Sequence, residues 1–131
     1  MTDKPFTVLL VEDSPLLSDR IMELLSAMPG ITPLVAVDTE AAAIAAIETQ
    51  NPDAILLDLS LKQGTGFGVM RHINRLSDKQ PAVIVISNYA LPQYRKEAKF
   101  LGAKFFLDKS QDLDLIPETL NALKQKQEQT L

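Results

Sequence analysis

The chain has 131 residues, 46% of them hydrophobic and 23% charged, with a net charge of −4 at pH 7 and no cysteine. This composition argues against a disordered chain, excludes disulfides and thiolate metal sites, and offers no broad basic surface for nucleic acid. No basic leader opens the sequence and no apolar run is long enough to cross a membrane, so we expect a cytoplasmic protein. The length predicts a single domain over residues 1–131, with its core at about 6–124 and a polar tail at about 125–131.

Short apolar runs alternate with helical stretches along the chain. The runs are apolar and partly β-branched, which is typical of buried strands, and they cover 6–11, 33–37, 54–59, 82–87 and 104–108. Helical spacing of apolar residues, with capping residues before it, predicts helices at about 15–28, 40–49, 67–77, 91–101 and 112–127. Ser14, and either Asp38 or Thr39, are expected to cap the first two helices. The alternation predicts an α/β fold: a doubly wound, five-stranded parallel sheet with helices on both faces.

Polar side chains lie at the ends of these strands. Glu12 and Asp13 follow the first strand, Asp58 lies in the third, Ser87 ends the fourth, and Lys109 follows the fifth. Each alone is adequately explained as a polar residue of a strand-end loop. In an open parallel sheet, however, ligands bind outside the carboxyl ends of the strands, and three carboxylates gathered there would repel each other without a cation. Together these residues indicate a site at that edge.

The segments "LLVEDSP", "LLDLSLKQGTG", "VIVIS" and "GAKFFLDKS" carry these residues, and together they closely resemble the receiver domain of two-component response regulators. The resemblance covers almost the whole chain and is to single-domain, chemotaxis-type receivers. It implies a flavodoxin-like fold with strand order 2-1-3-4-5. It also implies a phosphoprotein of phosphorelay signal transduction, which is phosphorylated by a sensor histidine kinase or a histidine phosphotransfer protein. Phosphorylation would then change its affinity for a downstream protein partner. The resemblance implies no enzyme activity beyond assisting its own phosphorylation and dephosphorylation. The acidic net charge and the short apolar runs predict no direct nucleic-acid contact and no membrane insertion.

Carried over residue by residue, the resemblance assigns a role to each polar position. Asp58 would be the phosphoacceptor, Ser87 would donate a hydrogen bond to the phosphoryl group, and Lys109 would neutralise its charge. Mg²⁺ prefers hard oxygen ligands, and the resemblance implies that it is held by Glu12, Asp13, Asp58 and the backbone carbonyl of Ser60. Ser87 and Phe106 would act as the switch that changes the surface of the fourth helix, fifth strand and fifth helix.

Four positions depart from the family pattern. Lys62 stands where a proline is common, which predicts a more mobile loop after Asp58. Asn88 replaces a smaller residue and could narrow access to Asp58 or contact the phosphate. Phe106 lacks the hydroxyl of the commoner tyrosine, and a plain core role fits it as well as the switch role. Ser110 replaces a proline after Lys109, so we predict a trans bond there, because a cis bond without proline costs roughly 3–4 kcal/mol. We also expect Ser110 to cap the last helix.

Two further side chains have simple interpretations. Tyr89 lies two residues after Ser87, where its ring could shield the phosphoryl group, or it is a half-exposed loop aromatic. His72, the only histidine, is expected to be a solvated helical side chain.

Alternative functions on a similar sheet remain. One is a degenerate receiver that binds partners without phosphorylation. A second is an aspartyl-phosphate phosphotransferase enzyme, but that family carries a D-x-D motif on its first strand, and here "DLSL" lies on the third. A third is a flavodoxin-like electron carrier, which needs a Ser/Thr/Gly-rich phosphate loop where this chain has "VEDSPLL".

Overall fold

Five parallel strands form one sheet in the computed structural model, which describes residues 4–129. The strands lie in the order β2-β1-β3-β4-β5, so the predicted flavodoxin-like topology is confirmed. Their bounds are β1 Phe6–Val11, β2 Ile31–Val37, β3 Ala54–Asp58, β4 Ala82–Ser87 and β5 Phe105–Asp108. This order makes β3 the central strand and places β2 and β5 at the two edges.

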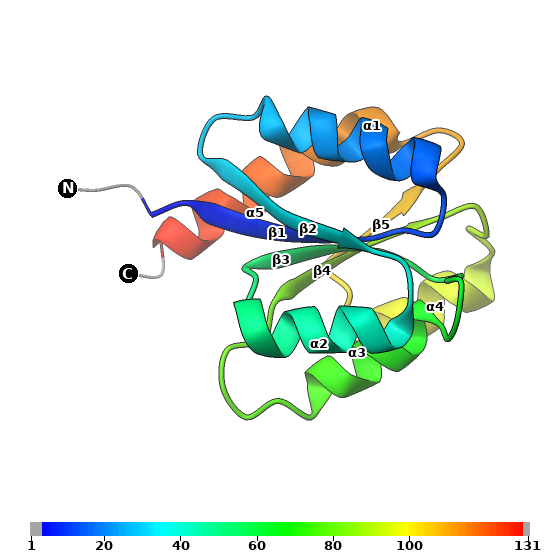
Figure 1. The fold of residues 1–131 in the computed structure, drawn as a ribbon. Coiled ribbons are helices and arrows are strands. Elements are labelled where there is room, and N and C mark those ends of the chain that lie inside the picture. The colour runs from blue at the N-terminus through cyan, green and yellow to red at the C-terminus, as the bar shows by residue number, and fades with distance from the viewer. Residues whose placement is uncertain (1–3, 130–131) are drawn as a thin grey trace.

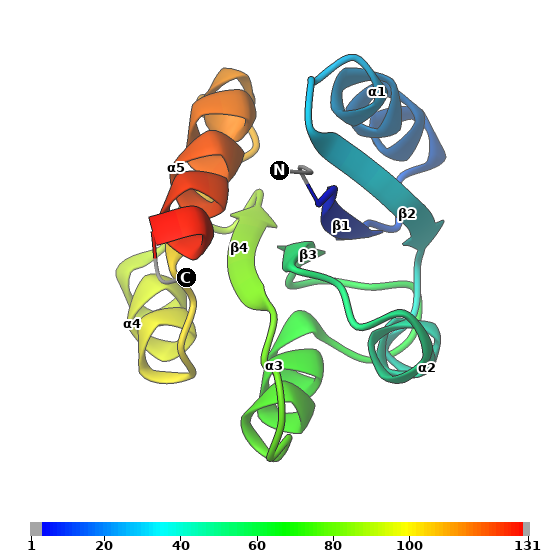
Figure 2. The same ribbon diagram turned by 90° about the vertical axis from the view of Figure 1, so that its left-hand side faces the viewer.

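The helices cover both faces of the sheet (Figure 1). The view along the strands shows α1 and α5 on one face and α2, α3 and α4 on the other (Figure 2). The bounds are α1 Pro15–Ser26, α2 Glu40–Gln50, α3 Gly66–Asn74, α4 Pro92–Phe100 and α5 Ile116–Gln129, with a short 3-10 helix at Leu113–Leu115. No helix within residues 4–129 combines the length and the apolar character needed to cross a membrane.

The core consists of two layers, because alternate side chains of each strand point to opposite faces. Leu9, Ile55 and Leu57 pack toward α2, α3 and α4, while Leu10 and Leu56 pack toward α1 and α5. All five of these side chains are fully buried. A strand that is buried on both faces must be apolar along its whole length, which explains the unbroken apolar runs in the sequence.

Side-chain caps fix where the first three helices begin, and with them the loops that precede them. The Ser14 hydroxyl accepts the N–H of Leu17 at 3.3 Å, and Pro15 follows as the first helical residue. Thr39, not Asp38, caps α2, and Thr65 caps α3, each accepting an N–H three residues ahead at 3.1 Å. Each cap satisfies one of the backbone donors that a helix start leaves unpaired.

Several predicted boundaries were wrong. α1 ends at Ser26 instead of 28, and α3 ends at Asn74 instead of 77. β2 begins at Ile31, two residues before the predicted start. The last helix begins at Ile116 instead of 112, and Ser110 does not cap it. The Ser110 hydroxyl and N–H both donate to Asp108 Oδ1, at 2.7 and 2.9 Å, so this side chain closes a local turn after β5. α5 continues to Gln129, so the predicted polar tail is helical as far as that residue, and the rest of it lies outside the described residues.

Candidate functional site

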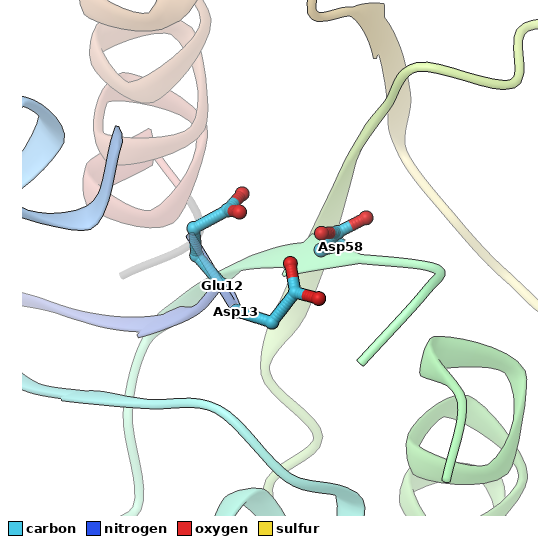
Figure 3. A group of neighbouring side chains, drawn as sticks. All are labelled: Glu12, Asp13 and Asp58. Carbon is cyan, nitrogen blue, oxygen red and sulfur yellow. The ribbon is translucent and has the colours of Figure 1, made fainter. Parts of the chain in front are cut away.

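Three carboxylates meet at the carboxyl edge of the sheet. Glu12 and Asp13 follow β1, and Asp58 ends β3, and these two strands are neighbours that pair Val11 with Leu57. One carboxylate oxygen from each residue lies within 4.8 Å of the others, and the side chains converge in Figure 3. Glu12 and Asp58 are only 2% and 4% exposed, whereas Asp13 is exposed. The strand pairing thus gathers charges from sequence positions 46 residues apart.

Lys109 reaches this cluster from beyond β5. Its Nζ lies 2.8 Å from Asp58 Oδ2 and 2.8 Å from Glu12 Oε1. Its backbone N–H donates to the Ser87 carbonyl at 2.9 Å, which anchors the residue at the end of β4. The ammonium group is almost fully buried, so it compensates two buried carboxylates directly.

Burial and charge shift the pKa values of this group. Burial raises the pKa of Asp58 to about 6, the neighbouring Glu12 carboxylate adds to the rise, and the Lys109 hydrogen bond opposes it. Burial alone would lower the pKa of Lys109, but its hydrogen bonds to Asp58 and Glu12 outweigh that effect and raise it. Lys109 therefore stays charged at neutral pH, whereas Asp58 gains or loses its charge at a pH close to neutral.

The donor atoms fit a hard divalent cation. Glu12 Oε1 is buried and lies 2.8 Å from Lys109 Nζ as an ion pair, while the hydrogen bond from Lys109 Nζ goes to Glu12 Oε2 at 3.1 Å. Glu12 Oε2 accepts the Ser14 N–H at 3.0 Å, and Asp58 Oδ1 accepts the Ser60 N–H at 3.2 Å, so both carboxylates are held in place. Three clustered carboxylates, one of them exposed, suit Mg²⁺, which takes a few protein oxygens and keeps several waters.

Ser87 lies at the same edge of the sheet, but its side chain is hydrogen-bonded to the loop after β4. It follows Ile86, which pairs with Asp58, and its side chain is fully buried. Its Oγ accepts the N–H of Tyr89 at 2.9 Å. This bond uses an acceptor lone pair and leaves the hydroxyl proton free to be donated.

Phe106 is half-buried on β5 and packs against the core layer under α2, α3 and α4. The Arg95 guanidinium of α4 lies 4.7 Å from its ring centre, a cation–π distance. Nothing in the sequence distinguishes Arg95 from the other charges of its helix, so this contact was not predicted. It joins α4 to β5 through the residue for which the switch role was expected.

The two residues that follow Ser87 lie at the surface. Tyr89 is 58% exposed, and its ring lies against Tyr94 of α4, 6.4 Å between centres. Asn88 is exposed. The Lys109–Ser110 bond is trans, since no peptide bond within the described residues is cis, which confirms that prediction.

The prediction that His72 is a solvated side chain was wrong. The His72 side chain is 17% exposed, and its Nε2 lies 3.2 Å from Glu48 Oε2 of α2. The packing of α2 beside α3 removes it from solvent, which its helical position alone could not reveal.

Comparison with known proteins gives one consistent family. The family model described as "Response regulator receiver domain" matches residues 8–121. The chain is 28% identical over 113 residues to the sensory transduction protein LytT of Enterococcus faecalis, covering 86% of this chain and 46% of that protein. It is 32% identical over 114 residues to protein-glutamate methylesterase/protein-glutamine glutaminase 2 of Koribacter versatilis, covering 86% of this chain and 31% of that protein. The chain therefore spans less than half the length of these two relatives.

Solved structures show the same fold. The receiver domain of a putative LuxO repressor protein from Vibrio parahaemolyticus superposes with a TM-score of 0.85 at 27% identity, over 94% of this chain and 92% of that one. The Mn²⁺-bound form of the response regulator Rcp1 superposes with a TM-score of 0.74 at 28% identity, over 92% of each chain.

Proposed function

Because this chain belongs to the response regulator receiver family, we propose that it is a phosphorylation-dependent signalling switch in which Asp58 accepts a phosphoryl group. The donor is a phosphohistidine on a sensor histidine kinase or a histidine phosphotransfer protein. The observation that carries the proposal is the joint contact of Lys109 Nζ with Asp58 and Glu12 at the carboxyl edge of the sheet. A buried lysine held between carboxylates is a preformed partner for the charge that a phosphoryl group brings.

The transfer requires only a carboxylate oxygen of Asp58 and charge compensation around it. The oxygen attacks phosphorus, an O–P bond forms, and the P–N bond to the imidazole breaks with its electron pair leaving on nitrogen. Lys109 balances the charge on the phosphoryl oxygens, and the Ser60 N–H keeps the Asp58 carboxylate oriented at 3.2 Å. Positioning and charge neutralisation supply most of the catalysis in such transfers.

Glu12, Asp13, Asp58 and the backbone carbonyl of Ser60 would hold Mg²⁺. When bound, the ion neutralises charge on the phosphoryl oxygens and aligns them for transfer. The three carboxylates support this assignment, because one oxygen of each lies within 4.8 Å of the others.

Ser87 and Phe106 would convert the phosphoryl group into a change of surface. The Ser87 hydroxyl has a proton to donate to a phosphoryl oxygen, and moving it would displace the loop that its Oγ holds through Tyr89. A displaced loop would release Phe106 from beneath Arg95, and the surface of α4, β5 and α5 would present itself differently to a downstream protein.

The proposal is tested by offering the full chain a small phosphodonor, acetyl phosphate, with Mg²⁺ and measuring intact mass. Wild type should gain one phosphoryl group, and Asp58→Asn should gain none. Asp53→Asn is the matched control, because Asp53 is also buried but lies immediately before β3, at the end of the strand opposite Asp58. Beryllofluoride with Mg²⁺ should then shift the amide signals of Ser87, Phe106 and Lys109 in wild type and in Asp53→Asn, and should leave them unchanged in Asp58→Asn. Labelling of Asp58→Asn, or a wild type that takes no label, would contradict the proposal and favour a phosphorylation-independent binding module.

A further inference from the structure

The loop that follows Asp58 is folded back on itself. It runs from residue 59 to 65, between β3 and α3, and Ser60 and Thr65 face each other across it as an antiparallel bridge. The Gly66 N–H donates to the Leu59 carbonyl at 2.9 Å and closes the base. Gly64 turns the tip at φ +82°, a conformation that glycine adopts without strain. Ser60, the residue next to the phosphoacceptor site, therefore depends on how this loop is held.

The tip of the loop is bound to the start of α2. The Lys62 N–H donates to the Asp38 carbonyl at 3.0 Å, and the Glu40 N–H donates to the Gln63 carbonyl at 2.9 Å. The Thr65 N–H donates to Glu40 Oε1 at 3.0 Å. A proline at position 62 has no N–H for the first of these bonds. The backbone N–H of Lys62 therefore helps to hold the loop in place, which argues against the greater mobility expected from the sequence.

The side chain of Glu40 occupies a place that two glycines leave open. A Cβ added at Gly64 or at Gly68 would overlap the Glu40 side chain. Its carboxylate lies at the N-terminus of α3, where Thr65 is the cap, and Glu40 also belongs to the first turn of α2. Helix N-termini carry partial positive charge and unpaired N–H groups, so one carboxylate stabilises the starts of two helices.

We propose that Glu40 is a positioning residue for the Asp58 site. Its carboxylate clamps the 59–65 loop against α2 and thereby holds the Ser60 backbone where it serves Asp58 and Mg²⁺. The inference rests on the proposed function of the site and extends it to a residue that touches none of the acidic cluster. In this chain, contacts with the start of α2 would hold the loop in place of the proline that is common at position 62 in the family.

Three variants separate the reach of Glu40 from its charge. Glu40→Gln keeps an oxygen that can accept the Thr65 N–H, Glu40→Asp keeps the charge but is one methylene shorter, and Glu40→Ala loses both. Removing a side chain that supports a metal ligand typically weakens metal affinity about 10- to 100-fold, and we expect about tenfold for the Asp and Ala variants. The Gln variant should stay within about twofold of wild type. The Asp variant keeps the test decisive if the Ala variant fails to fold.

Glu48→Ala is the matched control. Glu48 also lies on α2 and also links it to α3, through His72, but at the far end of the helix from the Asp58 site. The readouts are the Mg²⁺ dissociation constant, from the amide shift of Ser60, and the solvent exchange rate of the Thr65 amide without metal. Exchange should accelerate in the Asp and Ala variants of Glu40 and stay unchanged in Glu48→Ala.

The outcomes separate the two proposals. Wild-type Mg²⁺ affinity retained by all three Glu40 variants overturns the positioning role and leaves the proposed function standing. An equal loss in Glu48→Ala also overturns it, since the effect would then be general to the α2–α3 contact. A wild type that binds no Mg²⁺ and takes no phosphoryl group refutes the proposed function, and the positioning role with it.

Discussion

Two buried aspartates lie at opposite ends of the central strand, Asp53 just before it and Asp58 as its last residue, and their surroundings shift their pKa values in opposite directions. Burial raises the pKa of Asp58, and the Glu12 carboxylate adds to that rise. At the other end, burial would also raise the pKa of Asp53, but the hydrogen bonds from Lys79 and from Thr7 outweigh it and lower the pKa. The fold therefore makes Asp53 a fixed negative charge and leaves Asp58 close to titration at physiological pH.

Asp58→Asn should stabilise the metal-free protein. Because the pKa of Asp58 is about 6 in the folded chain against 3.8 as the ordinary value, its ionisation destabilises the fold increasingly as pH rises between them. At pH 7 the substitution should raise the free energy of unfolding by about 1–3 kcal/mol, since each unit of pKa difference is about 1.4 kcal/mol. The gain should be smaller at pH 5, and urea denaturation without Mg²⁺ measures both.

Asp53→Asn is the comparison, and its sign is the reverse. It loses a charged hydrogen bond to Lys79, whose contribution is present above the ordinary aspartate pKa and is lost as pH falls through the lowered value. This variant should therefore be less stable than wild type at pH 7. Equal effects of the two substitutions would refute this account of the strand.

At the scale of elements, the connection from β3 to α3 depends on close backbone approach. A Cβ added at Gly66 would collide with the backbone carbonyl oxygen of Asp58, which cannot move aside as a side chain could. Gly66→Ala should therefore cost about 1–3 kcal/mol of stability, as overpacked positions do, and should weaken Mg²⁺ binding because the Asp58 carboxylate moves with its backbone. Denaturation and Mg²⁺ titration check both effects. Unchanged values would show that the loop relaxes freely.

The element boundaries show where sequence reasoning stops. Ser14, Thr39 and the apolar runs identify the strands and helix starts because the signals are local. The start of α5 was misplaced because the Ser110 hydroxyl donates to Asp108 and does not cap the helix. The backbone N–H of Asp108 in turn donates to Asp112 Oδ2 at 2.9 Å. A serine can cap a helix or close a turn, and only the neighbouring geometry decides between these bonds.

At the scale of the whole molecule, the convergence of Glu12, Asp13, Asp58 and Lys109 followed from the strand pattern, since parallel strands end at a common edge. The contacts of Arg95 with Phe106 and of Glu40 with Thr65 did not follow. They join elements distant in sequence through particular side-chain conformations, which no local pattern specifies.

Mg²⁺ should stabilise the whole protein in a pH-dependent way. A ligand that binds only the folded state adds about 1.4 kcal/mol at tenfold its dissociation constant. Protons compete with the metal at Asp58, so the gain should shrink as pH falls below about 6. Thermal unfolding with and without Mg²⁺ at pH 7.5 and pH 5 measures it. The same gain at both values, or in Asp58→Asn, would place the bound ion elsewhere.

β3 is enclosed by strands on both sides and by helices on both faces. Its amide hydrogens should exchange for deuterium only through global opening, whereas those of the edge strands β2 and β5 should exchange through smaller, cheaper openings. Asp58 ends the central strand β3, and Phe106 lies on the edge strand β5, so slow exchange is expected at Asp58 and faster exchange at Phe106. The proposed phosphorylation chemistry would thus lie on the strand expected to open last, and its proposed signal on an edge strand expected to open more easily.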